Sequence, residues 1–273
     1  MKKLRACLVV LAAFVLTAAL SVSAYAAKAD EKHQEIAKRI ADEYNKAHPT
    51  EPVETVKTMS WIAKLKSKVK VTTEENGDVV KLKAGKKVTV IQRDYHAAKG
   101  TSEVRLPDGQ TCYIPNRYLT FTKPVCTGAA GDYSDATKLA YINGQFIQSA
   151  TEYLIWISLD KQRVYIFRGT PKNWALVAEA PGGGIMKASS GAGESPTLDN
   201  TFCTYYYIKW KKPAIDSMTW FSSFYGSGIH RFVGPGKYNM GKKPISHSCV
   251  RVTNNNAKWV FNNIPLKTRV WIW

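Results

Sequence analysis

The chain has few cysteines, few acidic residues and only one long apolar run. Five cysteines occur in 273 residues. None shows Cys-x-x-Cys spacing, and no cluster of other metal-binding residues accompanies them, which argues against a cysteine-ligated zinc site. Repeats and low-complexity tracts are absent. After the N-terminus, no stretch is long and apolar enough to span a bilayer, so we expect no further membrane segment.

The first residues are typical of an export signal. Lys2, Lys3 and Arg5 precede an apolar run from Ala6 to Leu20, and residues 24–26 read Ala-Tyr-Ala, the small-x-small pattern of a cleavage site. The run is about 15 residues, shorter than the roughly 20 that span a bilayer. We therefore expect a cleaved signal peptide over residues 1–26 and a secreted protein that does not associate with the membrane after cleavage.

Basic residues outnumber acidic ones by 39 to 21, which gives a formal charge of +18. Cleavage would remove three positive charges and leave +15. A basic protein outside the cell attracts anionic polymers. Export argues against nucleic acid as the partner. The alternative interpretation is that scattered lysines only keep the chain soluble.

Residues 27–59 are expected to be helical at first. Ile36, Ile40 and Tyr44 recur every four residues and would form one apolar face. Pro49 and Pro52 would end the helix. The pattern fits either a docking helix or a helical spacer.

Residues 60–123 contain five short β-type runs separated by turn sequences. The runs are 69–71, 79–82, 88–91, 104–106 and 113–114. Five short strands in about sixty residues predict a small barrel.

Residues 124–149 are expected to be a linker with a short helical stretch near 134–139. From residue 150 the pattern is β again. Strands are predicted at 153–159, 163–167, 174–177, 201–205, 221–225 and 269–273. One helix follows Thr253, a good N-cap, with Ala257, Val260, Phe261 and Ile264 on its apolar face. The predicted class is mainly β.

The chemistry is densest between Ile245 and Arg251. Cys249 would attack acyl carbons only as a thiolate, so it needs a base nearby, because a free cysteine has a pKa of about 8.5. His247 would share a face with Cys249 in an extended segment, and His230 lies further upstream. Either histidine is a candidate base, and Arg251 is a candidate carboxylate ligand.

His230, fifteen residues, and then Ser246-His247-x-Cys249-x-Arg251 resembles the L,D-transpeptidase signature. Weaker similarities flank it over roughly residues 150–273. They are Tyr153–Trp156, Gln162–Gly169, Trp174, Ser195-Pro196-Thr197 with Phe202, Asn256–Trp259 and Asn263–Pro265. Residues 82–115 resemble a bacterial Src-homology-3-like domain, which commonly contacts wall peptide or glycan. The alternative is a spacer barrel without a ligand.

The resemblance implies a role for each residue of the motif. Cys249 would be the nucleophile and His230 the general base, its ring held by the carbonyl of Arg231. His247 would shape the pocket, Ser246 would support the loop, and Arg251 would hold the loop or a substrate carboxylate. Backbone N–H groups from Ser248 to Val250 would form the oxyanion hole. The implied fold is an L,D-transpeptidase-type β-sandwich with a small helix after the nucleophile.

The implied activity is peptidoglycan cross-linking in the bacterial cell wall or periplasm. An acyl group would pass from a tetrapeptide stem, with release of D-alanine, to the side-chain amine of another stem. Water as acceptor would make the enzyme a carboxypeptidase. Partners would be stem peptides and, as candidates, anionic wall polymers such as teichoic acids. No metal or cofactor is needed, and carbapenems are the expected inhibitors.

Four departures from the family pattern occur where glycine or threonine is usual. They are Ser248, Asn200, Lys267 and the pair Arg231-Phe232. Ser248 matters most: a left-handed conformation there would cost energy and could misplace the oxyanion donors. The alternatives are a sortase, disfavoured by motif spacing, a papain-like hydrolase, disfavoured by residue order, and a degenerate wall-binding protein. If Cys249 is free, at most one disulfide can form among Cys112, Cys126 and Cys203.

Overall fold

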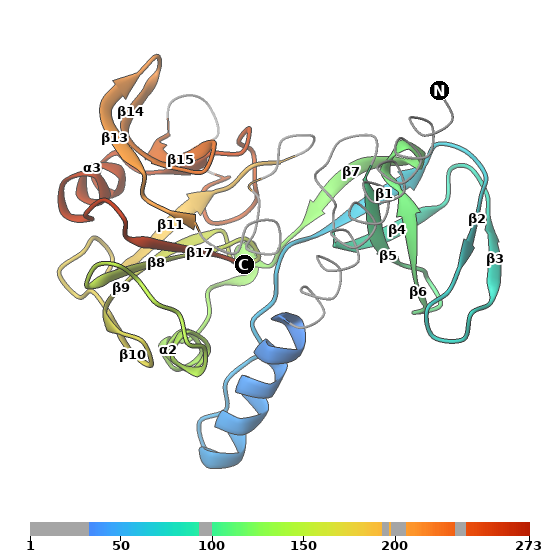
Figure 1. Ribbon diagram of the computed structural model, residues 1–273, viewed down its shortest axis with the longest axis horizontal. Helices are drawn as coiled ribbons and strands as arrows, with labels where there is room; N and C mark the ends of the chain where they lie inside the picture. Colours follow the sequence, from blue (N-terminus) through green and yellow to red (C-terminus); the bar gives the residue numbers. More distant parts are fainter. Residues whose placement is uncertain (1–32, 93–99, 193–196, 198–205, 233–238) are drawn as a thin grey trace, which may run out of the picture.

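The computed structural model describes residues 33–92, 100–192, 197, 206–232 and 239–273 (Figure 1). The predicted signal peptide (1–26), the strand expected at 201–205 and Cys203 lie outside these ranges. Among the described residues, no helix has the length and apolar character needed to cross a bilayer.

The C-terminal region is built on one ten-stranded sheet, which confirms the mainly β prediction. Its order is β12-β17-β8-β9-β11-β16-β15-β14-β13, with β10 paired to β9. The bounds are β8 Tyr153–Ser158, β9 Arg163–Thr170, β10 Asn173–Leu176, β11 Ile185–Ser189, β12 Tyr206–Tyr207, β13 Trp210–Ile215, β14 Met218–Phe224, β15 Ser227–Arg231, β16 Val250–Val252 and β17 Arg269–Ile272. The sequence patterns located β8, β9, β10, β14 and β17; β11, β13, β15 and β16 were not predicted.

The central strand β8 shows why this region needs helices on both faces. All six of its residues are buried. Leu154 and Trp156 belong to a cluster that includes Ile142 of helix α2 (Asp135–Gly144). Ile155 belongs to the other cluster, with Val260 of helix α3 (Asn254–Asn263). A strand covered on both faces reads as a continuous apolar run.

Helix α3 begins where it was predicted, whereas helix α2 is longer than predicted. The side chain of Thr253 accepts a hydrogen bond from the Asn256 N–H at 3.3 Å, which confirms the predicted cap of α3. Helix α2 runs five residues past the helical stretch expected in the linker, and its Tyr141 and Ile142 are buried in the core. The segment predicted as a linker is therefore largely a structured part of the C-terminal region.

The N-terminal region contains a five-stranded antiparallel sheet and a two-stranded hairpin. The sheet order is β6-β5-β4-β1-β7, and β2 pairs with β3. The bounds are β1 Ser60–Leu65, β2 Val69–Thr72, β3 Val79–Leu82, β4 Lys87–Gln92, β5 Thr101–Arg105, β6 Thr111–Pro115 and β7 Leu119–Val125. The five predicted strands correspond to β2–β6, whereas β1 and β7 were missed. The Src-homology-3-like assignment stays a prediction.

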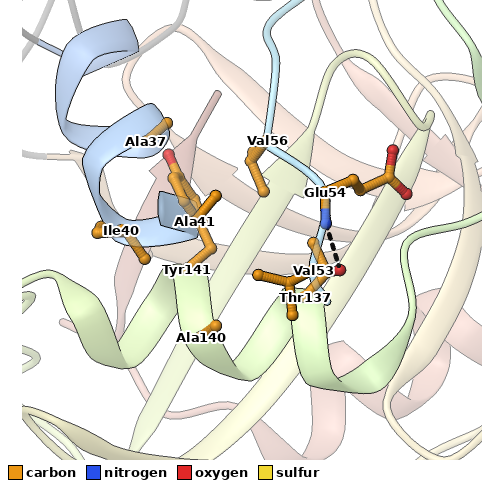
Figure 2. A pocket seen from close by; sticks show the side chains of 9 residues that line it. All are labelled: Ala37, Ile40, Ala41, Val53, Glu54, Val56, Thr137, Ala140 and Tyr141. Atoms are coloured by element: carbon orange, nitrogen blue, oxygen red, sulfur yellow. Dashed lines mark hydrogen bonds between the residues drawn. The ribbon is translucent and has the colours of Figure 1, made fainter. Parts of the chain in front are cut away.

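The N-terminal helix, helical over 33–47, packs on the C-terminal region. Ala37, Ile40 and Ala41 are buried and face Ala140 and Tyr141 of α2 (Figure 2). A Cβ on Gly144 would lie 2.8 Å from the Ile40 side chain, so the two helices approach closely. Of the two alternatives that the sequence left open, the structure shows a docked helix.

The chain after this helix is also fixed to α2. The side chain of Asn45 accepts from the Val53 N–H at 2.6 Å and donates to the Val53 carbonyl. The Glu54 N–H donates to Thr137 Oγ1 at 3.3 Å, the dashed line in Figure 2. Backbone groups of an irregular segment are thus paired with side chains, as burial requires.

Candidate active site

Two adjacent parallel strands bring the motif residues together. In β15 and β16, Ile229 lies opposite Val250, and His230 lies opposite Arg251. Cys249 directly precedes β16, so the same register places it beside Gly228 at the edge of β15. Neighbouring strands are about 4.8 Å apart. The sheet therefore brings Cys249, Arg251 and His230 together although loops separate them in sequence.

The imidazole of His230 is held in one orientation. Its side chain is 3% exposed. Nδ1 lies 2.7 Å from the carbonyl oxygen of Arg231. A carbonyl only accepts, so Nδ1 carries the proton and donates it. Nε2 is buried and has no partner among the described residues, which leaves its lone pair available to accept a proton.

The surroundings of His230 favour its neutral form. Burial lowers its pKa below the ordinary value, and the positive charge of Arg251 lowers it further. The hydrogen bond to the Arg231 carbonyl acts in the opposite direction. A neutral imidazole near pH 7 is the form that can take a proton from a thiol.

An aromatic stack supports the His230 ring from the neighbouring strands. Phe221 of β14 stacks on His230, with ring centroids 5.8 Å apart and planes 18° apart. Trp210 of β13 stacks on Phe221 at 5.3 Å and 19°. A Cβ on Gly228 would lie 2.4 Å from the Phe221 ring. Glycine at 228 therefore leaves the space that this ring occupies.

The β13–β14 hairpin is fixed to α3 at both ends of the helix. The Lys211 ammonium donates to the carbonyls of Phe261 and Ile264 at the C-terminal end, where a helix favours a cation. The Trp220 indole N–H donates to Asn254 Oδ1 at 3.1 Å at the N-terminal end. These contacts fix the hairpin that carries Phe221 and Trp210.

The segment before Cys249 is bent, not extended. Ser248 has φ 76°, in the left-handed region, and residues 247–249 form a bend. The condition under which His247 and Cys249 would share a face, an extended segment, is therefore not met. His247 is exposed, whereas Cys249 is partly buried.

Two hydroxyl groups hold the left-handed Ser248. Its carbonyl accepts from Thr197 Oγ1 at 2.5 Å and from Ser227 Oγ at 2.8 Å. Thr197 Oγ1 in turn accepts from the Gly191 N–H at 2.8 Å. Left-handed backbone costs roughly 1–2 kcal/mol for a residue with a side chain, and two hydrogen bonds of about 1 kcal/mol each offset this cost.

The remaining predicted site residues lie around this centre. Ser246 is buried and bridges to Gly191, and its N–H donates to the Ser190 carbonyl at 3.0 Å. Val250 is buried in the core. Arg231 is exposed apart from its carbonyl contact with His230. The Arg251 guanidinium carbon lies 5.5 Å from the centre of the Phe232 ring.

The other described cysteines are unbridged. Cys112 is buried in β6, and burial raises the pKa of its thiol to about 11. Cys126 is also free, and its thiol donates to the Lys242 carbonyl at 3.3 Å. Residues 195, 196, 200 and 202 of the weaker motif lie outside the described ranges. Where the structure describes the chain, no three His, Cys, Asp or Glu side chains cluster as for a metal ion.

Sequence reasoning missed several residues of the site. Phe221 was assigned only to a strand, Ser227 and Trp210 were not singled out, and Thr197 was noted only as part of a weak motif. Their contacts depend on strand register and on loops that return to Ser248. No local pattern signals such contacts, so only the pairing of β13, β14 and β15 reveals them.

Comparison with known proteins agrees with this geometry. Residues 152–272 match the family model of YkuD, the L,D-transpeptidase catalytic domain. No curated protein matches the chain.

Three similar solved structures illustrate the range of likeness. A fused Zn-dependent amidase/peptidase/peptidoglycan-binding domain-containing protein from Clostridium acetobutylicum is 28% identical with a TM-score of 0.43, covering 51% of this chain and 59% of its own. An L,D-transpeptidase from Xylanimonas cellulosilytica is 21% identical with a TM-score of 0.34, covering 54% and 76%. One from Mycobacterium tuberculosis is 15% identical with a TM-score of 0.37, covering 84% of both chains. Residues 152–272 of the chain are thus similar to the L,D-transpeptidase catalytic domain.

Proposed function

We propose that the protein is a peptidoglycan L,D-transpeptidase that uses Cys249 as nucleophile and His230 as general base. The observation that carries the proposal is the fixed, buried imidazole, whose Nε2 has no partner among the described residues, on the strand beside Cys249. A base needs this combination: one nitrogen anchored, the other available, and a pKa that keeps it neutral.

The first half of the reaction would form a thioester. His230 Nε2 takes the Cys249 thiol proton, and the thiolate attacks the carbonyl of the third stem residue. The oxyanion that forms would be stabilised by backbone N–H groups from Ser248 to Val250, where the chain bends before β16. His230 then gives its proton to the leaving amine, and D-alanine departs as the C–N bond breaks.

The second half would transfer the acyl group. The side-chain amine of another stem attacks the thioester carbonyl and loses a proton to His230. A new amide bond forms, and the sulfur of Cys249 leaves and recovers a proton from His230. His247, which is exposed, and Arg251, which is partly exposed, would contact substrate, Arg251 through a stem carboxylate. Buried Ser246 would support the loop.

The organisation we propose for the whole chain follows the same argument. Residues 1–26 would be the signal peptide, 27–59 a helical segment, 60–123 an Src-homology-3-like region, 124–149 a connection and 150–273 the catalytic region. The protein would act outside the cytoplasm, as is typical of the family, in the cell wall or periplasm. Hydrolysis of the same stem, or wall binding without catalysis, are the alternatives.

The test is turnover of a tetrapeptide stem by the mature chain, with and without a second stem as acceptor. We expect D-alanine release together with a cross-linked dimer, and neither product with Cys249→Ala. D-alanine release without the dimer would indicate a carboxypeptidase. No release by folded, reduced protein would favour the wall-binding alternative.

A further inference from the structure

Strands β1 to β4 of the N-terminal region form two antiparallel pairs, β1 with β4 in the five-stranded sheet and β2 with β3 as a separate hairpin. Residues 61–64 pair with 87–90, and residues 69–72 pair with 79–82. Continuing the first pairing by five residues along each arm arrives at the first pair of the second, so both share one register. Between them, the Leu65 N–H donates to the Lys86 carbonyl and the Gly85 N–H to the Leu65 carbonyl, at 2.9 and 2.8 Å. Figure 1 shows β2 and β3 at the outer side of the N-terminal region, joined to β1 and β4 by loops.

The two strand pairs carry a set of exposed lysines, which we call the lysine face. Directly opposite residues share a face of an antiparallel pair, so Lys64 lies beside Lys87 in the first pair and Lys70 beside Lys81 in the second. Lys66, Lys68 and Lys83, in the segments between the two pairs, are also exposed and complete the set of seven. The neighbouring Ala63, Leu65 and Leu82 are buried, which agrees with the alternation of side chains along a strand.

The lysine face has no internal counter-charge. Neither arm, 60–73 or 79–92, contains an aspartate or glutamate. The acidic residues Glu74, Glu75 and Asp78 lie in the turn, where the Glu75 carboxylate accepts hydrogen bonds from Thr111. Among the described residues, none of the seven lysines forms an ion pair.

The arrangement is unfavourable without a partner. Lys64 lies directly opposite Lys87, and Lys70 lies directly opposite Lys81. Like charges in opposed positions destabilise a strand pair, and a surface that only keeps a protein soluble intersperses both signs. The cost of assembling seven ammonium groups would be offset by a ligand that carries many negative charges.

We propose that the lysine face binds a linear polyol-phosphate polymer of the cell wall, with each ammonium opposing a phosphodiester. Lysine ammonium groups are hydrated point charges that attract phosphate without reading its shape. Val79 is the only exposed large hydrophobic side chain of β1 to β4. One valine is too little for insertion into a bilayer, and no exposed aromatic ring of these strands could stack on bases.

This interaction goes beyond the proposed reaction and uses a different region of the chain. It depends on the proposed function only for its location outside the cytoplasm. Its consequence would be to retain the catalytic region at a wall that carries such polymers.

The test is fluorescence anisotropy of labelled poly(glycerol phosphate) with the chain lacking residues 1–26, at 50 and 200 mM salt. The variant carries Lys64→Gln, Lys70→Gln and Lys81→Gln. The control carries the same charge loss at exposed Lys38, Lys46 and Lys57. We expect at least a tenfold loss of affinity in the variant and less than twofold in the control. The slope of log affinity against log salt should become shallower by about two in the variant, because each phosphate contact contributes roughly 0.7–0.9.

Equal losses in variant and control would overturn the proposal, since the lysine face would then be one part of a general positive charge. Tighter binding to phosphatidylglycerol vesicles, or to an oligonucleotide of equal charge, would also overturn it and assign the face to a membrane or nucleic acid. Acylation by a carbapenem is measured on the same samples. Acylation without polymer binding defeats this proposal alone, and polymer binding without acylation defeats the proposed function alone.

Discussion

The candidate active site and the lysine face differ in how deeply their polar and charged groups are buried and in how firmly these groups are held. His230 is buried, anchored by one hydrogen bond and stacked on a ring. The seven lysines are exposed, two pairs of them lie directly opposite each other, and none forms an ion pair with the described residues. Proton transfer depends on the position of a single atom, whereas attraction of a polyanion depends on summed charge. A single substitution in the site should therefore change the reaction rate strongly, whereas each substitution on the lysine face should change polymer affinity only a little.

His230→Gln should have the largest effect on the acylation of Cys249. Glutamine keeps polarity and similar size but cannot accept and return the proton. We expect acylation of Cys249 by a carbapenem to slow by about 10²–10⁴-fold, the usual contribution of a general base. The measurement is the rate of adduct formation by intact mass.

The matched control is His247→Gln, at an exposed histidine two residues from the nucleophile. Its acylation should slow far less, because this ring has no buried anchor. If His247→Gln is the slower variant, the base has been assigned to the wrong histidine.

The next largest effect should come from removing the two hydroxyl groups that donate to the Ser248 carbonyl. In the double variant Thr197→Val and Ser227→Ala, that carbonyl loses both donors, and the bend before Cys249 is free to shift. Two hydrogen bonds of about 1 kcal/mol each correspond to roughly a 30-fold slower acylation. Thr122→Val removes a hydroxyl bond of the same kind, to the Ile62 carbonyl in the N-terminal region, and should leave the rate within threefold. Equal rates in all three proteins would contradict the role of these hydroxyls.

The aromatic stack should control the pH dependence of the site. In Phe221→Ala, water reaches the His230 ring, so burial lowers its pKa less and the pKa rises towards its ordinary value. His230 then becomes protonated at higher pH, and the acid limb of the acylation profile moves up in pH. We also expect a rate loss of about tenfold, because the ring is less well oriented.

Phe221→Tyr restores the ring and should return both rate and profile towards wild type. Phe224→Ala removes a buried ring of the same strand outside the stack, and controls for lost stability. An unchanged profile in Phe221→Ala would show that the stack only packs the sheet.

These residues show which features of the fold and the site the sequence alone predicts. The hairpin of β8 and β9 and the cap at Thr253 are local patterns, and the structure confirms both. The contacts of Phe221, Thr197 and Ser227 join segments far apart in the chain, so no spacing rule predicts them. The left-handed backbone at Ser248 was considered only because the related family has glycine there, since serine itself gives no signal for it.

The smallest effect should come from removing the side chain that makes the left-handed backbone at Ser248 unfavourable. Ser248→Gly removes a left-handed side chain and should raise the free energy of unfolding by about 1 kcal/mol or less, since greater freedom of glycine in the unfolded chain opposes the gain. Lys267→Gly offers a matched comparison, because Lys267 also has positive φ, 69°, in the turn before β17. Both should be measured by denaturant unfolding, and only Ser248→Gly should alter acylation. A loss of stability in both would show that neither position is strained.

The central claim is a competent Cys249 nucleophile, and intact mass after incubation with a carbapenem tests it most directly. The mature wild-type chain should gain one carbapenem mass, and Cys249→Ala should gain none. An adduct on both proteins would place the reactive group elsewhere. No adduct on folded wild-type protein with a reduced Cys249 would contradict the catalytic account.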